Sequence, residues 1–219
     1  MISLSQAFPF WNSLSDLEQE EVLNCMIIRQ YDAGEHLVKR PGLYLVNDGS
    51  IVLYSDHESG RRRVSFSAHW MECMLLTPEF LRHCETISVA LYAREASEIC
   101  FIRYEDWYRL SVNHPGISKF SEELLSEQMG RMAFVIYAYM EKDLSRRLAM
   151  FLLRYYERNK SSTGNTVFVS HEELAEQIGT GREAVSRNIN ILKNEGIVQT
   201  GRGKIFILDP EALRTYSKL

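Results

Sequence analysis

The segment HEELAEQIGTGREAVSRNINILKNEGIV, residues 171–198, decides how the C-terminal third of this chain folds. Two short amphipathic segments flank a glycine-bearing turn, GTG at 179–181. Ser170 and Glu173 have the spacing of a capping box, which predicts a helix that starts there and ends in the turn. A second helix is expected to begin near Arg182. Two short helices joined by a tight turn are typical of a helix-turn-helix.

The second predicted helix has an apolar side and a polar side. Val185, Ile189 and Leu192 recur at helical spacing and are expected to pack inward. The polar side chains opposite them are Glu183, Ser186, Arg187 and Asn190. Arginine can donate two hydrogen bonds to guanine, glutamate can accept one from cytosine, and serine and asparagine read several base edges. The spacing predicts a base-reading face, although it equally allows a Glu183–Arg187 pair on a solvated helix.

A glycine-tipped ribbon follows this helix. The stretch GIVQTGRGKIFILD predicts two strands, and the order of helix, helix and ribbon is that of a winged helix-turn-helix. Four cations are placed to contact DNA phosphates and set the register: Arg182, Lys193, Arg202 and Lys204. Residues 141–219 hold 13 Lys and Arg against 10 Asp and Glu, whereas residues 1–140 hold 12 against 19. The positive charge of +3 therefore favours the C-terminal part as the phosphate-binding region.

The N-terminal half predicts short strands. YLVNDGSIVLYS carries a hairpin signal at Asp48-Gly49, and TISVALYA and SEICFIRY add two further strands. Many short strands with frequent turns indicate a sandwich or barrel.

A long helix without proline is expected over residues 117–140. Its apolar residues recur in steps of four, three, four and three, which is typical of a coiled-coil seam. The residues of this seam are Leu125, Met129, Met132, Ile136 and Tyr139. They would equally serve as the core of one domain, but the length of the helix between two differently built regions favours a homodimer.

The segment GREAVSRNINILKNEGIV followed by GKIFIL resembles the recognition helix and wing of the Crp/Fnr family of bacterial transcription regulators. RLAMFLL resembles that family's helix after the dimer helix, and LYLVNDGSIVLY resembles its β-roll. The resemblance covers nearly the whole chain and is most specific in the last third. It implies an α+β fold with an effector-sensing β-roll (jelly-roll-like) domain at 1–116, a dimerisation helix at 117–140 and a winged helix-turn-helix DNA-binding domain at 141–219.

By this resemblance, Glu183, Ser186 and Arg187 correspond to the family's E-x-x-S-R base-reading set. It implies a homodimer on double-stranded DNA, at an inverted repeat with TTGA-like half-sites in successive major grooves. RNA polymerase and a small-molecule effector are further implied partners. Gly181 stands where relatives usually have serine or threonine, and glycine is an acceptable N-cap at a cost of roughly a few tenths of a kcal/mol.

The effector is not identified by the sequence. The family's cyclic-nucleotide branch needs a turn like F-G-E and then R-S or R-T, whereas this chain reads HWMECMLLTPEFLRHCETIS. Glu85, near the place of the arginine, would repel a cyclic phosphate, so the sequence argues against cyclic AMP. The iron–sulfur branch needs an N-terminal cysteine cluster, and the first cysteine here, Cys25, stands alone. The residues that remain as candidates for an effector pocket are Trp70, Glu72 and Met74.

Four residues in the same region are candidate haem or metal ligands, because imidazole and thiolate both serve that role. They are His69, Cys73, His83 and Cys84. Their spacing lacks a ligand pair, which favours packed cysteines and surface histidines. A haem- or redox-sensing regulator stays open as an alternative.

A cupin-like metal-dependent enzyme is the alternative from another class, because a β-roll resembles a cupin barrel. Such enzymes hold the metal with an H-x-H pair, and this chain has none. It also lacks a P-loop, G-x-S-x-G and H-E-x-x-H, so catalysis is not predicted. The longest apolar run, AFVIYAYM, is well short of the ~18 residues of a membrane span. With an N-terminus unlike a signal peptide, the sequence predicts a cytoplasmic protein without a membrane partner.

Overall fold

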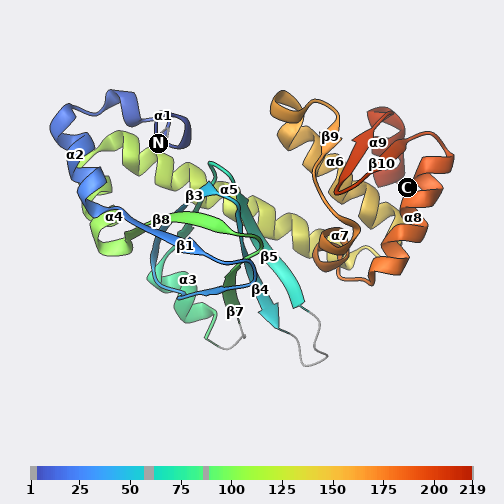
Figure 1. Ribbon diagram of the computed structural model, residues 1–219, viewed down its shortest axis with the longest axis horizontal. Helices are drawn as coiled ribbons and strands as arrows, with labels where there is room; N and C mark the ends of the chain where they lie inside the picture. The colour runs from blue at the N-terminus through green and yellow to red at the C-terminus, as the bar shows by residue number, and fades with distance from the viewer. Residues whose placement is uncertain (1–3, 57–61, 86–88, 219) are drawn as a thin grey trace. The chain divides into compact units, whose positions relative to one another are not determined.

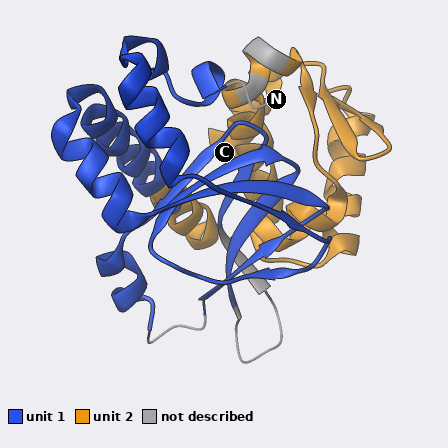
Figure 2. Ribbon diagram, turned by 60° about the vertical axis from the view of Figure 1, so that its left-hand side comes forward, with its two compact units in different colours: residues 1–132 blue, residues 133–219 orange. Residues whose placement is uncertain are grey.

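The computed structural model describes residues 4–56, 62–85 and 89–218 (Figure 1). The chain forms two compact units, Met1–Met132 and Ala133–Leu219, and their boundary falls inside the long helix α5, Pro115–Met140 (Figure 2). An N-terminal sheet domain, one long helix and a C-terminal helix-turn-helix confirm the predicted α+β fold. These two units are defined by the contacts within each of them, not by function. The three-part functional division at 1–116, 117–140 and 141–219 therefore stays a prediction.

Two antiparallel four-stranded sheets build the sandwich of the first unit. In the first sheet the strands lie in the order β1 (Ile27–Tyr31), β8 (Ser97–Arg103), β3 (Gly42–Asp48) and β6 (Cys73–Leu76). In the second sheet the order is β2 (His36–Leu37), β7 (Val89–Ala93), β4 (Ser50–Asp56) and β5 (Arg62–His69). Within the described residues of this unit, the strand pairings are antiparallel.

The hairpin predicted at Asp48-Gly49 is wrong in one respect. The chain does turn there, with Gly49 at φ +79°, but β3 pairs with β6 and β8, and β4 pairs with β5 and β7. The turn therefore carries the chain from one sheet to the other. A Cβ at Gly49 would overlap the Ser97 side chain, so glycine fits this corner for two reasons. The Asp48-Gly49 pair predicts the turn, whereas the burial of β3 and β4 decides which strands they pair with.

Strand β3 is buried on both faces because the first sheet lies between two apolar layers. Tyr44 and Val46 pack between the sheets, whereas Leu43 and Leu45 pack beneath a layer of helices. The helical elements of this unit are α1 (Leu4–Ala7), η1 (Trp11–Ser13), α2 (Asp16–Cys25), α3 (Pro78–His83), α4 (Tyr104–Asn113) and the first part of α5. Trp107 of α4 is fully buried there, and its indole N–H donates to the Ser121 hydroxyl at 2.9 Å.

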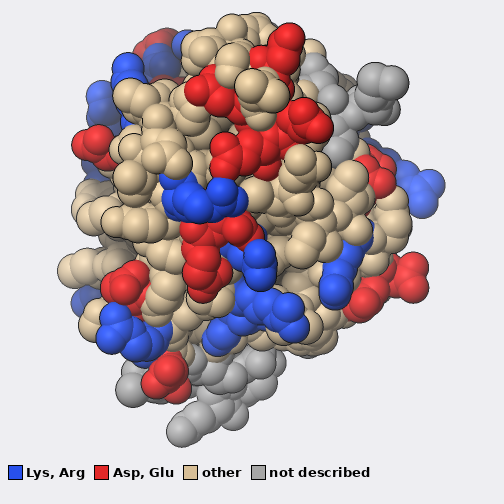
Figure 3. Space-filling view, turned by 90° about the vertical axis from the view of Figure 1, so that its left-hand side faces the viewer, with Lys and Arg blue, Asp and Glu red and all other residues tan. Residues whose placement is uncertain are grey.

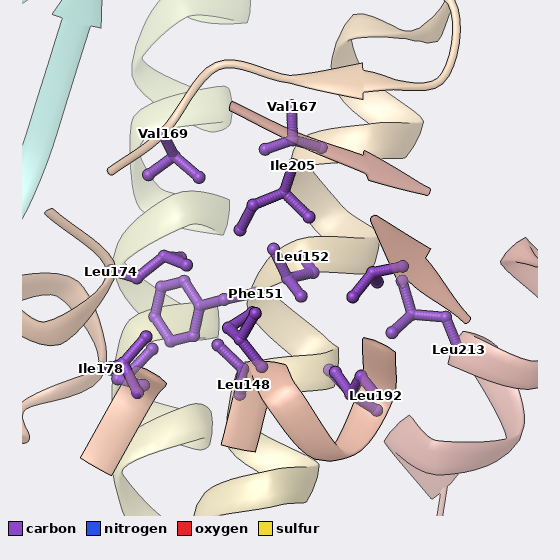
Figure 4. Close-up of a cluster of buried hydrophobic side chains, with 14 of the residues drawn as sticks. Leu148, Phe151, Leu152, Val167, Val169, Leu174, Ile178, Leu192, Ile205 and Leu213 are labelled. Carbon is purple, nitrogen blue, oxygen red and sulfur yellow. The ribbon is translucent and has the colours of Figure 1, made fainter. Parts of the chain in front are cut away.

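The second unit has a single apolar core under a three-stranded sheet. Its helices are the last part of α5, α6 (Leu144–Thr163), α7 (His171–Ile178), α8 (Arg182–Asn194) and α9 (Pro210–Lys218). Its sheet has the order β10 (Val198–Gly201), β11 (Lys204–Ile207) and β9 (Thr166–Val167). Figure 4 shows Leu148 and Leu152 of α6 meeting side chains of α7, α8 and the sheet. In the part of the chain that the structure describes, no helix is long and apolar enough to cross a membrane.

Candidate DNA-binding surface

Helix α7 begins with the predicted capping box. The Ser170 N–H donates to Glu173 Oε2 at 2.6 Å, and the Glu173 N–H donates to Ser170 Oγ at 3.1 Å. The helix ends at Gly179, whose φ of +69° places it in the left-handed region. A Cβ on Gly179 would also overlap the ring of Tyr139. The predicted start and end of α7 are therefore both confirmed.

Helix α8 turns its apolar side inward, as its sequence predicts. Val185, Ile189 and Leu192 are at most 1% exposed and belong to the core of the second unit. Gly181 is the N-cap at φ −87° and makes no side-chain capping bond. The orientation of α8 thus rests on apolar packing, and packing fixes which side chains point outward.

The four predicted base-reading residues lie on the outward side of α8. Glu183, Arg187 and Asn190 are exposed, and within the described ranges their side chains have neither a hydrogen-bond partner nor an ion pair. The Glu183–Arg187 pair that the spacing allows is therefore not formed. Ser186 differs, since it is half-buried and its hydroxyl lies 2.9 Å from Nδ1 of His171. Three polar groups are left available to a partner, and one is held by a neighbour.

The predicted phosphate contacts are divided between α8 and the ribbon. Arg182 and Lys193 are exposed in the first and last turns of α8. Arg202 is exposed at the ribbon tip, between the paired residues Gly201 and Lys204. The ammonium of Lys204 lies 5.2 Å from the centre of the Phe206 ring. The first three cations reach into solvent, whereas Lys204 lies back along its own strand.

His171 is a residue of this surface that the sequence reasoning missed. It is half-buried at the start of α7, and burial lowers the pKa of its imidazole, with the nearby positive charge of Arg182 as the second cause. The sequence does show that His171 is the first residue of α7, because the capping box of Ser170 and Glu173 fixes where that helix begins. Only the packing of α7 against α8 shows that this first residue meets Ser186.

The predicted dimer seam is divided in the structure. Met129 and Ile136 are 70% and 63% exposed, whereas Leu125 and Met132 are half-buried. Tyr139 is half-buried as well, and its hydroxyl donates to the Glu176 carbonyl oxygen at 3.4 Å. Two other large apolar residues of α5 are exposed, Tyr137 and Met140. The apolar surface that α5 offers to a partner is therefore Met129, Ile136, Tyr137 and Met140.

The three candidate effector residues lie in different surroundings. Trp70 is 61% exposed, and Met74 is fully buried between the sheets. Glu72 accepts a hydrogen bond from the His69 N–H at 3.1 Å and lies 3.7 Å from the Arg131 guanidinium. The three residues do not form a shared lining, so their role in effector binding stays a prediction.

Two side chains of α5 that the sequence reasoning did not single out hold the edge of the sandwich. Gln128 is 6% exposed; its Oε1 accepts from the Leu75 N–H at 2.8 Å, and its Nε2 donates to the Leu75 carbonyl at 3.1 Å. Because β6 is the last strand of its sheet, these bonds satisfy peptide groups that would otherwise lack a strand partner. Arg131 donates to the Ser67 carbonyl at 3.2 Å and pairs with Glu127.

The four candidate metal ligands are dispersed. Cys73 is buried with the helical layer and Cys84 with the inter-sheet core, and burial raises the pKa of both thiols. His83 is exposed and His69 half-buried. The described residues contain no group of three or more His, Cys, Asp or Glu side chains placed to hold a metal ion.

The first unit carries mixed charges on the face drawn in Figure 3, where acidic and basic side chains lie next to one another. Arg109 pairs with Glu21 at 2.6 Å, and Arg103 pairs with Asp106 at 2.7 Å. Such pairs neutralise one another. The cations of α8 and the wing tip lack carboxylate partners among the residues described, which favours the second unit as the DNA-binding part.

Known proteins resemble this chain over the second unit and over its whole length. Residues 146–216 match the family model of the Crp-like helix-turn-helix domain. The cyclic AMP receptor protein of Thermus thermophilus is 25% identical over 212 residues, or 94% of each chain. The transcriptional regulatory protein btr of Bordetella pertussis is 29% identical over 126 residues, which are 56% of this chain and 52% of that protein.

Solved structures show the same arrangement of elements. A transcriptional regulator of the crp/fnr family from Eubacterium rectale is 25% identical, with a TM-score of 0.65 over 97% of this chain and 99% of that one. A CooA mutant from Carboxydothermus hydrogenoformans shares the fold at 20% identity, with a TM-score of 0.75 over 90% and 89% of the two chains.

A sheet sandwich, a long helix and a winged helix-turn-helix with an exposed polar recognition helix define a DNA-binding transcription regulator. Residues 146–216 form a Crp-like helix-turn-helix domain, and the chain is similar over nearly its whole length to regulators of the Crp/Fnr family. Relatives with stated functions are regulators rather than enzymes, which argues against the cupin-like alternative.

Proposed function

We propose that this regulator acts as a homodimer that reads an inverted repeat with TTGA-like half-sites through Glu183, Ser186, Arg187 and Asn190. Arg182, Lys193, Arg202 and Lys204 contact phosphates, and an effector in the sandwich domain controls the affinity. The observation that supports base reading most directly is Arg187, which is exposed on α8 without an internal partner in the described chain. A guanidinium presented in this way suits guanine O6 and N7.

Replacing Arg187 tests base reading. Arg187→Ala is expected to weaken binding to a duplex carrying the TTGA-type inverted repeat by roughly 1–3 kcal/mol, because two hydrogen bonds to a base are lost. Binding to a scrambled duplex should hardly change. Fluorescence anisotropy at fixed salt measures both affinities. The matched control is Lys193→Ala on the same helix, which should weaken binding to both duplexes alike. Equal losses on both duplexes for Arg187→Ala would reject base reading by this residue.

The exposed apolar surface of α5 supports the dimer. Met129, Ile136 and Met140 are separated by seven and four residues, so they share one side of the helix. Ile136→Glu is expected to convert the dimer into a monomer, because a charge would be buried in the seam. Val112→Glu is the control, since Val112 of α4 is similarly exposed, at 66% against 63%. Sedimentation that gives the wild type as a monomer would overturn the dimer and with it the inverted repeat.

The effector is the least specified part of the proposal. Glu85 near the expected phosphate position and the internal contacts of Glu72 argue against cyclic AMP, although a relative carries the name cyclic AMP receptor protein. Native mass spectrometry of protein purified from its own host tests for a bound effector. Extra mass that leaves on denaturation would give the effector's chemical class. A dimer without extra mass would indicate a regulator that acts without an effector.

A further inference from the structure

His171 lies against the one base-reading candidate that is not fully exposed. The Ser186 hydroxyl is 2.9 Å from His171 Nδ1, which is within hydrogen-bond distance. Both side chains are half-buried. Within the described residues, Ser186 has no other side-chain hydrogen bond, and the tautomer of His171 decides which of the two groups donates. The contact joins the first residue of α7 to the outward side of α8.

The position of His171 is fixed from two directions. The capping box of Ser170 and Glu173 sets where α7 begins, immediately before His171. Leu174 and Ile178 of α7 pack in the same core as Val185 and Ile189 of α8, which sets the distance between the helices. These contacts place the backbone of His171, and the contact with Ser186 orients its ring.

We propose that His171 is a positioning and specificity-determining residue: its Nδ1 accepts the Ser186 hydroxyl proton, so that Ser186 offers only lone pairs to the major groove. This inference rests on the proposed reading of bases by α8. A hydroxyl has one donor and two acceptor sites, and giving the proton to His171 leaves only acceptors. The base edge facing Ser186 must then supply a donor, either adenine N6 or cytosine N4.

A histidine that orients Ser186 and a histidine that contacts a DNA phosphate would have different effects on binding. A histidine that contacts phosphate would aid binding to any sequence and increase the dependence of affinity on salt. A histidine that orients Ser186 acts on one base pair only, and its effect disappears when Ser186 is absent. Burial and the charge of Arg182 lower the pKa of the imidazole, which favours the neutral form that can accept a hydrogen bond.

A double-mutant cycle on DNA tests the proposal. The probe is the duplex that the wild-type dimer enriches from a randomised inverted repeat, together with its variants at the base pair facing Ser186. His171→Ala should reduce the preference for the cognate pair by about 3- to 10-fold, the value of one hydrogen bond. Ser186→Ala should do the same, and the double variant should lose no more than Ser186→Ala alone. His171→Asn should restore part of the preference, because its amide oxygen can accept the proton.

The controls separate the possible failures. Glu172→Ala, an exposed change on the same turn of α7, should leave the base preference unchanged. Additive losses in the cycle, or an equal loss on scrambled duplex, would show that His171 acts independently of Ser186 and overturn the inference alone. Failure of the wild type to enrich any sequence would overturn base reading itself, and the inference with it.

Discussion

Arg131 of the first unit and Arg187 of the second unit have opposite roles. Arg131 of α5 has a side chain 13% exposed, donates to the Ser67 carbonyl, pairs with Glu127 and lies 4.8 Å from the centre of the Phe66 ring. Arg187 of α8 is exposed and, among the described residues, unpaired. One guanidinium completes a fold, whereas the other is available to a partner. Residue type is the same in both cases, and burial separates the roles.

Charge follows the same division. Residues 133–140 carry no charged side chain, so the second unit keeps the net +3 of residues 141–219, and the first unit holds the net −7. Several acidic and basic groups of the first unit pair with one another, among them Arg103, Arg109 and Arg131. Arg146 and Arg214 of the second unit are paired in the same way. The modest positive charge of the second unit is presented without such pairing on α8 and the wing tip. For DNA binding, the placement of cations matters more than the net charge of the chain.

The largest effect is expected at Gln128. Gln128→Leu keeps the size of the side chain but leaves the Leu75 N–H and carbonyl without their partner. Each buried group left unsatisfied costs about 1–3 kcal/mol, so the free energy of unfolding should fall by roughly 2–6 kcal/mol. Urea denaturation followed by far-UV circular dichroism measures the change. Glu122→Leu, an exposed change on the same helix, is the control. Equal midpoints for the two variants would show that the edge of β6 does not need Gln128.

A paired substitution tests the comparison of the two arginines directly. Arg131→Met should lower the free energy of unfolding by about 1–2 kcal/mol, because it removes the ion pairs with Glu72 and Glu127 and the donor to the Ser67 carbonyl. Arg187→Met should stay within about 0.5 kcal/mol of the wild type in stability. In anisotropy the order should reverse, with Arg187→Met losing specific affinity and Arg131→Met retaining it under conditions where it is folded. Similar stability losses for both variants would remove the distinction.

The sequence predicts the second unit better than the first because its signals are local. The capping box, the left-handed Gly179 and the stripe of Val185, Ile189 and Leu192 each depend on residues within one turn or helix. Sheet pairing depends on strands far apart, so the turn at Gly49 was found but its strand partners were not.

The other contacts that the sequence did not predict join segments that are distant along the chain. Gln128 meets Leu75 across 53 residues, and Tyr139 meets Glu176 across 37. Neither spacing has a periodic signature that a single sequence would display. The same reason applies to His171 and Ser186, which come together only because α7 and α8 share a core.

The smallest expected effect concerns pH and the second unit. Burial and Arg182 lower the pKa of His171 in the folded protein below its usual 6.5, so the unfolded chain binds the proton more readily. Stability should therefore fall as the pH drops below about 6.5 and be insensitive to this group well above it. Urea unfolding of the wild type and His171→Asn at about pH 5.5 and about pH 7.5 isolates the contribution, since the other titrating groups are common to both proteins. The wild type should lose more stability than the variant on acidification. A greater loss in the variant would mean that the folded state favours the protonated imidazole, and that His171 donates to Ser186 rather than accepting its proton.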